Sequence, residues 1–263
     1  MQAPKTAACA ALLATLATAG CGGSAPSAPT RLVSHRVVER FYGKGADSVW
    51  VFRRQNERPK AVVVFLHGLY DKVESTPLNH LDFVRHLAGR GYAVVYPRFE
   101  QEPGEPRAPL HALSGTVIGL RALGYEGKAP VVVMGYSRGG GLALDLAGLL
   151  PGVNVLASGV LSVFPALMDP PLPDYRSIPP TSPIVFLVGD RDTNVSHYGR
   201  DQMVQLLRLR GYPLGNVHTV VIHSTPVFRA DHYSFMGSTA PARRAFWDRA
   251  DALVESAIRT PAG

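Results

Sequence analysis

The chain has 263 residues, of which 46% are hydrophobic and 18% are charged, a composition that excludes a disordered or collagen-like chain. It supplies enough apolar side chains for the core of one large domain. The net charge is +7, but the basic residues are scattered, and arginine pairs occur only at Arg53-Arg54 and Arg243-Arg244. Because nucleic-acid-binding surfaces concentrate their basic residues, we predict no nucleic-acid partner, while a weak attraction to anionic lipid or an acidic substrate stays open.

Residues 1–20 have the pattern of a secretory signal peptide, in which Lys5 supplies a positive charge before a short run of Ala, Leu and Thr. This run is shorter than the ~20 apolar residues that span a bilayer. Its end, Thr18-Ala19-Gly20-Cys21, resembles a bacterial lipoprotein signal, in which the cysteine after two small residues receives the lipid. The sequence departs from that signal at Thr18, where Leu is most common. Plain secretion and an uncut N-terminus are the alternatives.

Residues 21–35, rich in Gly, Pro, Ala and Ser, are expected to form a flexible linker after the lipidated Cys21. The two cysteines of the chain, Cys9 and Cys21, both precede residue 36, so the domain at 36–260 is expected to fold without a disulfide. These features predict an exported protein of the bacterial cell envelope that is anchored to the membrane through lipid on Cys21. Without the lipid, the protein would be periplasmic or secreted.

Apolar runs of strand length alternate with helical patterns after the linker. Strands are expected at 37–42, 48–52, 61–66, 92–96, 130–135, 153–163, 183–188 and 217–222, and helices at 78–90, 110–123, 140–150, 201–209 and 243–258. The first two strands predict an antiparallel hairpin. The later alternation is typical of a single-domain α/β fold, with a mostly parallel sheet, helices on both faces and an antiparallel N-terminal edge. The stretch 165–183, which contains seven prolines, predicts a loop or minimal lid over the sheet edge.

A nucleophile motif lies between one of these strands and the next helix. The sequence Gly135-Tyr136-Ser137-Arg138-Gly139 fits the pattern G-x-S-x-G at a sharp strand-to-helix turn. Side chains at the two glycine positions would collide across such a turn, and the N-terminus of the following helix stabilises negative charge nearby. We therefore predict Ser137 to be a nucleophile, with an ordinary glycine-rich turn as the alternative.

A serine hydroxyl needs a base and a group that orients this base. Asp190 and Asp192 follow the strand at 183–188, and His232 follows the strand at 217–222. The chain order of serine, acid and histidine is the order that the motif requires. Successive strand ends of a parallel sheet place such loops on one edge, where the side chains can meet.

Other acids and histidines compete for these roles. Asp169, which follows the strand at 153–163, is a third candidate acid, and His223, at the end of a strand, is the main rival base. His80 and His86 lie within the first helix pattern, so we expect them on the surface.

These segments together resemble the α/β-hydrolase superfamily. The resemblance is carried by His67-Gly68 after a strand, by the turn at Ser137, and by the loops that contain the candidate acids and His232. It extends over about residues 36–260. The resemblance favours Asp192, in a Gly-x-x-Asp-x-x-Val setting, over Asp190, which would then cap its loop by accepting backbone hydrogen bonds. It favours His232 because this residue lies in the pattern Asp-His-x-x-Phe.

The same resemblance implies an oxyanion hole made of the backbone N–H groups of Leu69 and Arg138. Because only the backbone takes part, we expect the side chains of both residues to be free to shape the pocket. His67 is expected to pin its loop and to take no part in catalysis. The aromatic residues that either line an acyl pocket or pack in the core are Tyr70, Tyr136, Phe164, Tyr233 and Phe235.

We therefore predict a serine hydrolase that cleaves small to medium carboxylic esters through an acyl-enzyme. The alternatives are an acyltransferase, an amide or thioester hydrolase with the same triad, and a non-catalytic surface-binding protein of the same fold. No metal or cofactor is predicted, because the sequence has no His-Glu-x-x-His motif, no metal-binding cysteine set and no nucleotide-binding glycine loop.

Overall fold

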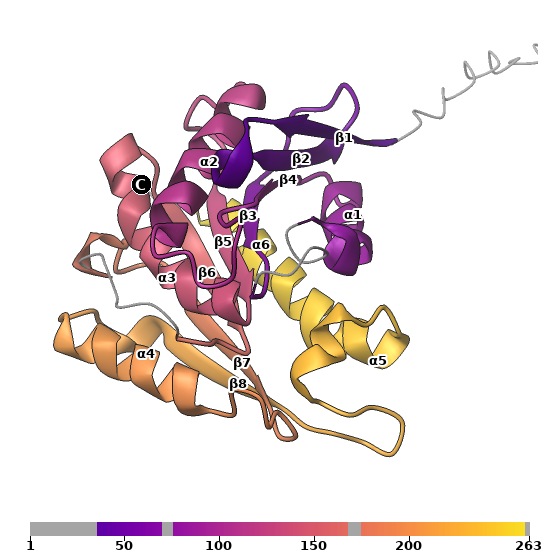
Figure 1. Ribbon diagram of the computed structural model, residues 1–263, viewed down its shortest axis with the longest axis vertical. Helices are drawn as coiled ribbons and strands as arrows, with labels where there is room; N and C mark the ends of the chain where they lie inside the picture. Colours follow the sequence, from indigo (N-terminus) through magenta and orange to yellow (C-terminus); the bar gives the residue numbers. More distant parts are fainter. Residues whose placement is uncertain (1–35, 70–75, 168–174, 261–263) are drawn as a thin grey trace, which may run out of the picture. The chain divides into compact units, whose positions relative to one another are not determined.

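The computed structural model describes residues 36–69, 76–167 and 175–260 (Figure 1). The predicted signal peptide, the linker and Cys21 lie outside the described residues, as do Tyr70, Asp169 and part of the proline-rich stretch. Within the described ranges, no helix combines the length and the apolar character that crossing a membrane requires.

A single eight-stranded sheet forms the centre of the described domain, in the order β1-β2-β4-β3-β5-β6-β7-β8 (Figure 1). The strands are β1 (Val37–Tyr42), β2 (Val49–Arg54), β3 (Val62–Leu66), β4 (Ala93–Pro97), β5 (Val131–Tyr136), β6 (Ala157–Val163), β7 (Ile184–Gly189) and β8 (Val217–Ile222). β1 pairs antiparallel with β2, and β2 pairs antiparallel with β4. All other neighbours are parallel. The predicted fold class, a mostly parallel sheet with an antiparallel N-terminal edge, is confirmed.

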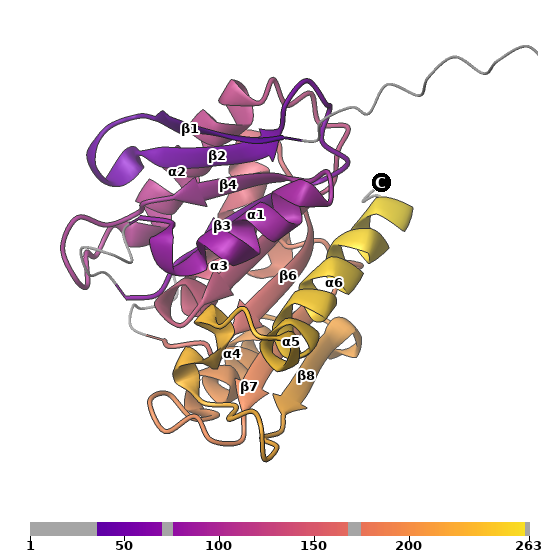
Figure 2. The same cartoon turned by 90° about the vertical axis from the view of Figure 1, so that its right-hand side faces the viewer.

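Helices cover both faces of this sheet. They are α1 (Leu81–Gly89), α2 (Ala108–Ala122), α3 (Arg138–Leu149), α4 (Tyr198–Leu209), the short α5 (Ala240–Ala242) and α6 (Asp248–Arg259). Figure 2 shows α1 and α6 in front of the sheet, with α2, α3 and α4 behind it. Each face therefore has its own layer of helices.

The central strands alternate their side chains between two separate cores. In β3, Val62, Val64 and Leu66 pack with α2 and α3, whereas Val63 and Phe65 pack with α1 and α6. Because both faces are covered by helices, a strand in this position must be apolar at every residue. This requirement explains why the runs at 61–66 and 130–135 are continuous and not alternating.

Several predicted boundaries differ from the structure: α1 begins three residues later than predicted, and α2 and α4 begin two and three residues earlier. β6 begins at Ala157 and not at residue 153, because Leu150–Val153 form a 3-10 turn and Asn154 takes a left-handed conformation with φ 59°. α3 begins at Arg138 and not at residue 140, directly after the turn at Ser137. The last predicted helix is divided into a π-helical turn over Arg243–Trp247 and then α6.

The connections around β3 create a crevice at one edge of the sheet. The chain leaves β3 for α1 on one face, whereas it leaves the adjacent β5 for α3 on the other face. Ligands of open α/β sheets bind where such neighbouring connections diverge, at the carboxyl ends of the strands. The loops that follow β3 and β5 are therefore the expected place of a ligand-binding site in this fold.

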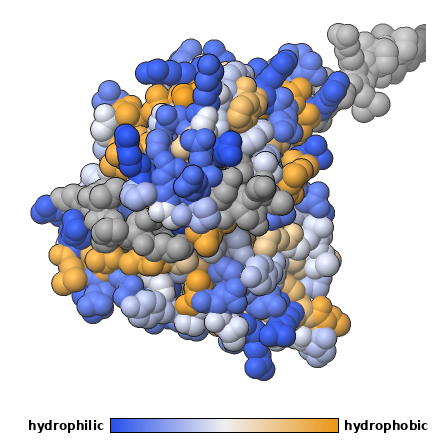
Figure 3. All heavy atoms as spheres, in the orientation of Figure 1, coloured by the Kyte–Doolittle hydropathy of each residue, from blue (hydrophilic) through white to orange (hydrophobic). Residues whose placement is uncertain are grey.

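Apolar surface residues are dispersed. On the face shown in Figure 3, orange apolar spheres occur in several small patches between blue hydrophilic ones. The large exposed apolar side chains come from different elements and include Phe41, Leu78, Tyr198, Leu209 and Val227. Scattered exposure of this kind is normal for a folded domain, so it does not mark a binding face.

The two-sided sheet core makes a direct stability prediction. Leu187, fully buried in β7, should lose about 2–5 kcal/mol of unfolding free energy when changed to Ala, because a cavity remains. Leu209, 72% exposed at the end of α4, is the matched control, and Leu209→Ala should change stability by no more than about 0.5 kcal/mol. Urea unfolding measures both values, and equal losses in the two variants would contradict this description of the core.

Candidate active site

Ser137 occupies a strained turn between β5 and α3. Its backbone angles are φ 54° and ψ −119°, a region that non-glycine residues rarely adopt. Three backbone hydrogen bonds hold it there. The Ser137 N–H donates to the Val163 carbonyl (2.9 Å), and the Ser137 carbonyl accepts from the N–H groups of Gly141 (3.1 Å) and Ala166 (3.0 Å). Strain of this kind persists only where the surroundings determine the conformation, and it concentrates at functional sites.

The two glycines of the motif allow the turn to close, as the sequence predicted. A Cβ atom on Gly135 would lie 2.0 Å from the Gly139 carbonyl oxygen. A Cβ atom on Gly139 would lie 2.3 Å from the carbonyl oxygens of Leu66 and His67. Both positions therefore exclude any larger residue, and the turn packs directly against the end of β3.

The structure brings Ser137, His232 and Asp192 together at the carboxyl edge of the sheet. Ser137 Oγ lies 2.9 Å from His232 Nε2, and His232 Nδ1 lies 3.0 Å from Asp192 Oδ2. All three residues are buried, with 8%, 6% and 6% of Ser137, His232 and Asp192 exposed. A histidine protonated on Nδ1 donates to the carboxylate and accepts the serine proton on Nε2. The geometry fits a nucleophile, its base and the group that orients the base.

Asp192 is held in its ionised form by its neighbours. Its Oδ1 accepts hydrogen bonds from the N–H groups of Asn194 (2.9 Å) and Val195 (3.2 Å). Burial acts to raise the pKa of Asp192, but the hydrogen bond and charge of His232 and the two backbone N–H groups outweigh burial and lower this pKa below its ordinary value. The carboxylate is therefore ionised and fixed in orientation at neutral pH.

The rival acid and base lie elsewhere. Asp190 accepts hydrogen bonds from the N–H (3.0 Å) and the hydroxyl (2.6 Å) of Ser224, which confirms its predicted role in capping a loop. His223 faces Asp190 at 3.5 Å, and its side chain is 77% exposed. Asp169, the third candidate acid, lies outside the described residues.

Tyr136, the residue before Ser137, positions the histidine loop. Its hydroxyl donates to the His232 carbonyl (3.0 Å), so the strand that carries the serine also holds the backbone of the proposed base. His232 begins a short 3-10 helix that ends at Met236, which the sequence analysis did not predict. The sequence could not predict the hydrogen bond between the Tyr136 hydroxyl and the His232 carbonyl, because these two residues are far apart in the chain.

A cavity of about 340 Å³ opens beside Ser137 and His232. Its other lining residues are Gly68, Leu69, Tyr136, Ala166, Asn194, Val195, Tyr233 and Met236. Of the aromatic candidates for an acyl pocket, Tyr136 and Tyr233 line the cavity, whereas Phe164 and Phe235 are buried in the core. Phe164 and Phe235 therefore pack in the core, which was the alternative to a place in the acyl pocket.

His67 pins the loop after β3, as predicted. Its ring is fully buried and stacks on Phe99 with a centroid distance of 4.1 Å. Its two ring nitrogens each lie 2.7 Å from a carbonyl oxygen, one of Gly68 and one of Arg98. The His67 carbonyl in turn accepts from the Gly139 N–H (2.9 Å), so the loop after β3 and the turn at Ser137 are joined directly.

The expectation that both oxyanion residues have free side chains is wrong for Arg138. Leu69 is 41% exposed and lines the cavity, but the Arg138 side chain is only 1% exposed. Its guanidinium Nη1 lies 2.8 Å from the buried carboxylate of Glu100, and its Nη2 donates to the Glu105 carbonyl (3.0 Å). Arg138 is not among the residues that line the cavity, and its buried charge has the paired anion and the hydrogen-bond acceptor that a buried cation requires.

The expected surface positions of His80 and His86 also need correction. His80 is 2% exposed, because a 3-10 turn over Leu78–His80 precedes α1 and turns this ring inward against Phe65, at a centroid distance of 5.0 Å. His86 is partly buried, and its Nε2 lies 2.9 Å from Asp251 Oδ2, which links α1 to α6. The surface expectation is therefore wrong for His80, whereas His86 keeps 26% of its side chain exposed.

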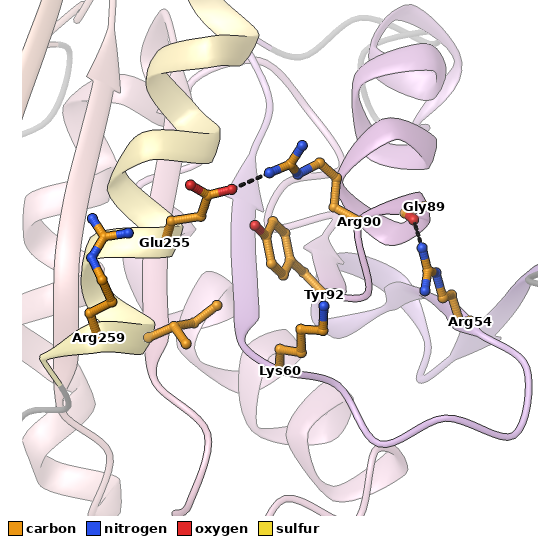
Figure 4. A pocket seen from close by; sticks show the side chains of 8 residues that line it. Arg54, Lys60, Gly89, Arg90, Tyr92, Glu255 and Arg259 are labelled. Carbon is orange, nitrogen blue, oxygen red and sulfur yellow. Dashed lines mark hydrogen bonds and ion pairs between the residues drawn. The ribbon is translucent and has the colours of Figure 1, made fainter.

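A second cavity, of about 550 Å³, lies at the opposite edge, beside the residues that precede β3 and β4 (Figure 4). It carries several cations, but Arg90 pairs with Glu255, and Arg54 donates to the Gly89 carbonyl. No serine or histidine of the described chain lines it. Across residues 36–69, 76–167 and 175–260, no three His, Cys, Asp or Glu side chains gather as metal ligands.

Comparison with known proteins identifies the architecture. No protein-family model and no curated protein matches the sequence. Among solved structures, an esterase from Pyrobaculum calidifontis has a TM-score of 0.58 and 19% identity, with 85% of this chain and 86% of that chain covered. The MGS-M1 α/β-hydrolase enzyme, from a Medee basin deep-sea metagenome library, has a TM-score of 0.56 and 15% identity, with 84% and 98% covered.

This chain has the α/β-hydrolase fold. A structure from a study of two fungal esterases from Rhizomucor miehei agrees, with a TM-score of 0.60, 14% identity and 84% of each chain covered. At such low identities the likeness establishes the fold alone. In this α/β-hydrolase fold, the cavity lies at the crevice that the divergent connections of β3 and β5 create.

The lowered pKa of Asp192 makes stability depend on pH. An ionised Asp192 stabilises the folded state above the ordinary carboxyl pKa of about 4, and this contribution is lost as the pH falls through the lower pKa of the folded state. The stability difference between wild type and Asp192→Asn should therefore be largest at neutral pH and shrink below about pH 4. Urea unfolding over a pH series measures it, and a difference that stays constant would contradict the assigned ionisation.

Proposed function

We propose that this protein is a serine hydrolase that cleaves small to medium carboxylic esters through an acyl-enzyme. The observation that carries the proposal is the continuous contact from Ser137 Oγ through His232 to Asp192, at 2.9 and 3.0 Å, beside a cavity. The strained backbone at Ser137 supports the same conclusion, because it presents the hydroxyl at the edge of the sheet.

In the first half of the reaction, Ser137 Oγ forms a bond to the ester carbonyl carbon while His232 Nε2 takes the hydroxyl proton. The carbonyl electrons move onto oxygen and give a tetrahedral intermediate. When this intermediate collapses, the bond to the alkoxy oxygen breaks and His232 returns the proton to that oxygen. The alcohol leaves, and Ser137 carries the acyl group.

Water completes the cycle. His232 takes a proton from water as the water oxygen attacks the acyl carbon, and then gives the proton to Ser137 Oγ as the acyl bond breaks. A carboxylic acid is released and the serine is regenerated. Asp192 holds the histidine in the productive tautomer and stabilises the imidazolium that forms in each half-reaction.

The developing oxyanion would be bound by the backbone N–H groups of Leu69 and Arg138. Leu69 lines the cavity next to Ser137, and Arg138 is the first residue of α3, where the helix N-terminus favours negative charge. Backbone donors of this kind stabilise the transition state more than the substrate, since they are aimed at charge that forms only during the reaction.

Esters of modest size fit the cavity. Its volume of about 340 Å³ lies at the lower end of the ~300–1,000 Å³ that small-molecule sites occupy. Leu69, Val195 and Met236 give it an apolar lining suited to a short acyl chain. Several solved proteins with this fold are described as esterases, which supports ester cleavage over the other acyl chemistries of the same triad.

We also propose that the protein is exported and anchored in the bacterial cell envelope by lipid on Cys21. This proposal rests on the charged start, the short apolar run and the Thr18-Ala19-Gly20-Cys21 end of residues 1–20. The linker at 21–35 would then separate the domain from the membrane surface and leave its active site accessible to esters outside the cytoplasm.

The nucleophile is tested by covalent labelling. An alkyl fluorophosphonate should form one adduct per wild-type molecule, at Ser137. The base His232 takes the hydroxyl proton as Ser137 Oγ bonds to phosphorus, and the P–F bond breaks and releases fluoride. Ser137→Ala should abolish labelling, whereas Ser238→Ala, at an exposed serine, should leave it unchanged. Intact-mass spectrometry and peptide mapping measure the adduct. Equal labelling of wild type and Ser137→Ala would exclude Ser137 as the nucleophile.

The choice of acid is tested with p-nitrophenyl esters from acetate to octanoate. Asp192→Asn should lower kcat by about 10⁴-fold, as loss of the orienting carboxylate does in another serine triad. Asp190→Asn should leave kcat within about three-fold, because Asp190 bonds Ser224 and does not touch His232. The reverse ranking would show that Asp190 is the functional acid. Added alcohols that accept the acyl group would reveal a transferase.

A further inference from the structure

Arg138 and Glu100 form a buried ion pair behind the nucleophile. Arg138 is the largest fully buried side chain of the described residues, and Glu100 is completely buried. Their charged groups lie 2.8 Å apart, and Arg138 also donates to the Glu105 carbonyl. Apolar residues of similar size often stabilise a core as well as a buried ion pair does. A contribution to stability alone therefore does not explain why the residue next to Ser137 is a buried, charged arginine paired with a buried glutamate.

The loop that carries Glu100 is itself closely constrained. Phe99 has a φ of 43°, unusual for an aromatic residue, and the Glu100 N–H donates to the Arg98 carbonyl (2.7 Å). The Phe99 ring stacks on His67, whose Nε2 contacts the same Arg98 carbonyl. The loop after β4 is thus fixed against the loop after β3.

These contacts form a closed circuit. From Arg138 the path runs through its guanidinium to Glu100, then along the chain to Phe99 and across to the His67 ring. It returns through the His67 carbonyl, which accepts from the N–H of Gly139, the residue after Arg138. The circuit therefore joins the loops after β3, β4 and β5 into one unit.

The two proposed oxyanion donors belong to this unit. The Arg138 N–H lies at its β5 end, and Leu69 follows His67 by two residues at its β3 end. An oxyanion hole requires both donors to lie about 2.7–3.1 Å from one position, so their separation must be fixed before the substrate arrives. The ion pair with Glu100 and the hydrogen bond to the Glu105 carbonyl both link the N-terminus of α3 to the loop after β4, and the ion pair is the charged one of these two links.

We propose that Glu100 and Arg138 are positioning residues, whose buried ion pair sets the distance between the Leu69 and Arg138 N–H groups. The proposal rests on the proposed serine hydrolase function. Neither side chain touches the substrate in this assignment, so both act through the backbone that they hold. Loss of the pair should weaken binding of the transition state and leave binding of the ground state largely unchanged.

The test compares Glu100→Gln with Glu255→Gln. Glu255 is the matched control, because it pairs with Arg90 at the exposed surface (Figure 4) and lines a different cavity from Ser137. With p-nitrophenyl butyrate, and with kcat expressed per titrated Ser137, Glu100→Gln should lower kcat at least about ten-fold while KM changes less than about three-fold. Glu255→Gln should leave both constants at the wild-type values.

A second readout separates positioning from a general structural effect. A butyl boronic acid adds to the serine as a tetrahedral species that resembles the transition state, so its inhibition constant should rise in proportion to the loss of kcat. Glu100→Gln removes the anion that compensates the buried charge of Arg138, which can prevent folding. The double variant Glu100→Met/Arg138→Met therefore replaces the whole pair by apolar side chains. It should fold and show the same kcat defect.

Each result decides a different point. A wild-type kcat in a folded Glu100→Gln or double Met variant would overturn the positioning role and leave the serine hydrolase intact. Failure of both variants to fold would assign the pair to folding and would also overturn it. Absence of Ser137-dependent turnover in the wild type would overturn the proposed function itself, and the positioning role with it.

Discussion

The strained backbone of Ser137 is the constraint on which the rest of the site depends. A φ of 54° at a serine is unfavourable, and here it is maintained by the hydrogen bonds of Val163 and Gly141 and by the close approach of Gly139 to the end of β3. The turn sets the hydroxyl at the sheet edge and starts α3 one residue later. The same turn therefore fixes the serine, one proposed oxyanion donor and the direction of the helix.

The parallel sheet supplies the partners of this turn. β7 and β8 end at the same edge as β5, so the loops that follow them bring Asp192 and His232 to Ser137. The hydroxyl of Tyr136 and the N–H groups of Asn194 and Val195 then hold the two loops in place. Buried polar groups of this site are paired with one another, which gives the site a single arrangement.

The sequence predicted what depends on local pattern. Continuous apolar runs located the buried strands, and the glycine spacing identified Ser137, because a strained turn excludes side chains at Gly135 and Gly139. Chain order and the resemblance then named Asp192 and His232. The pattern could not reveal that Arg138 is buried on Glu100, that His80 turns inward or that Tyr136 holds His232, because those contacts join segments that only the folded chain brings together.

The most direct measurement is the crystal structure of the protein after reaction with an alkyl fluorophosphonate. We expect phosphorus bonded to Ser137 Oγ, with the phosphoryl oxygen about 2.7–3.1 Å from the backbone nitrogens of Leu69 and Arg138, and the alkyl chain in the adjacent cavity. An adduct on another residue, or a phosphoryl oxygen directed away from both nitrogens, would contradict the account.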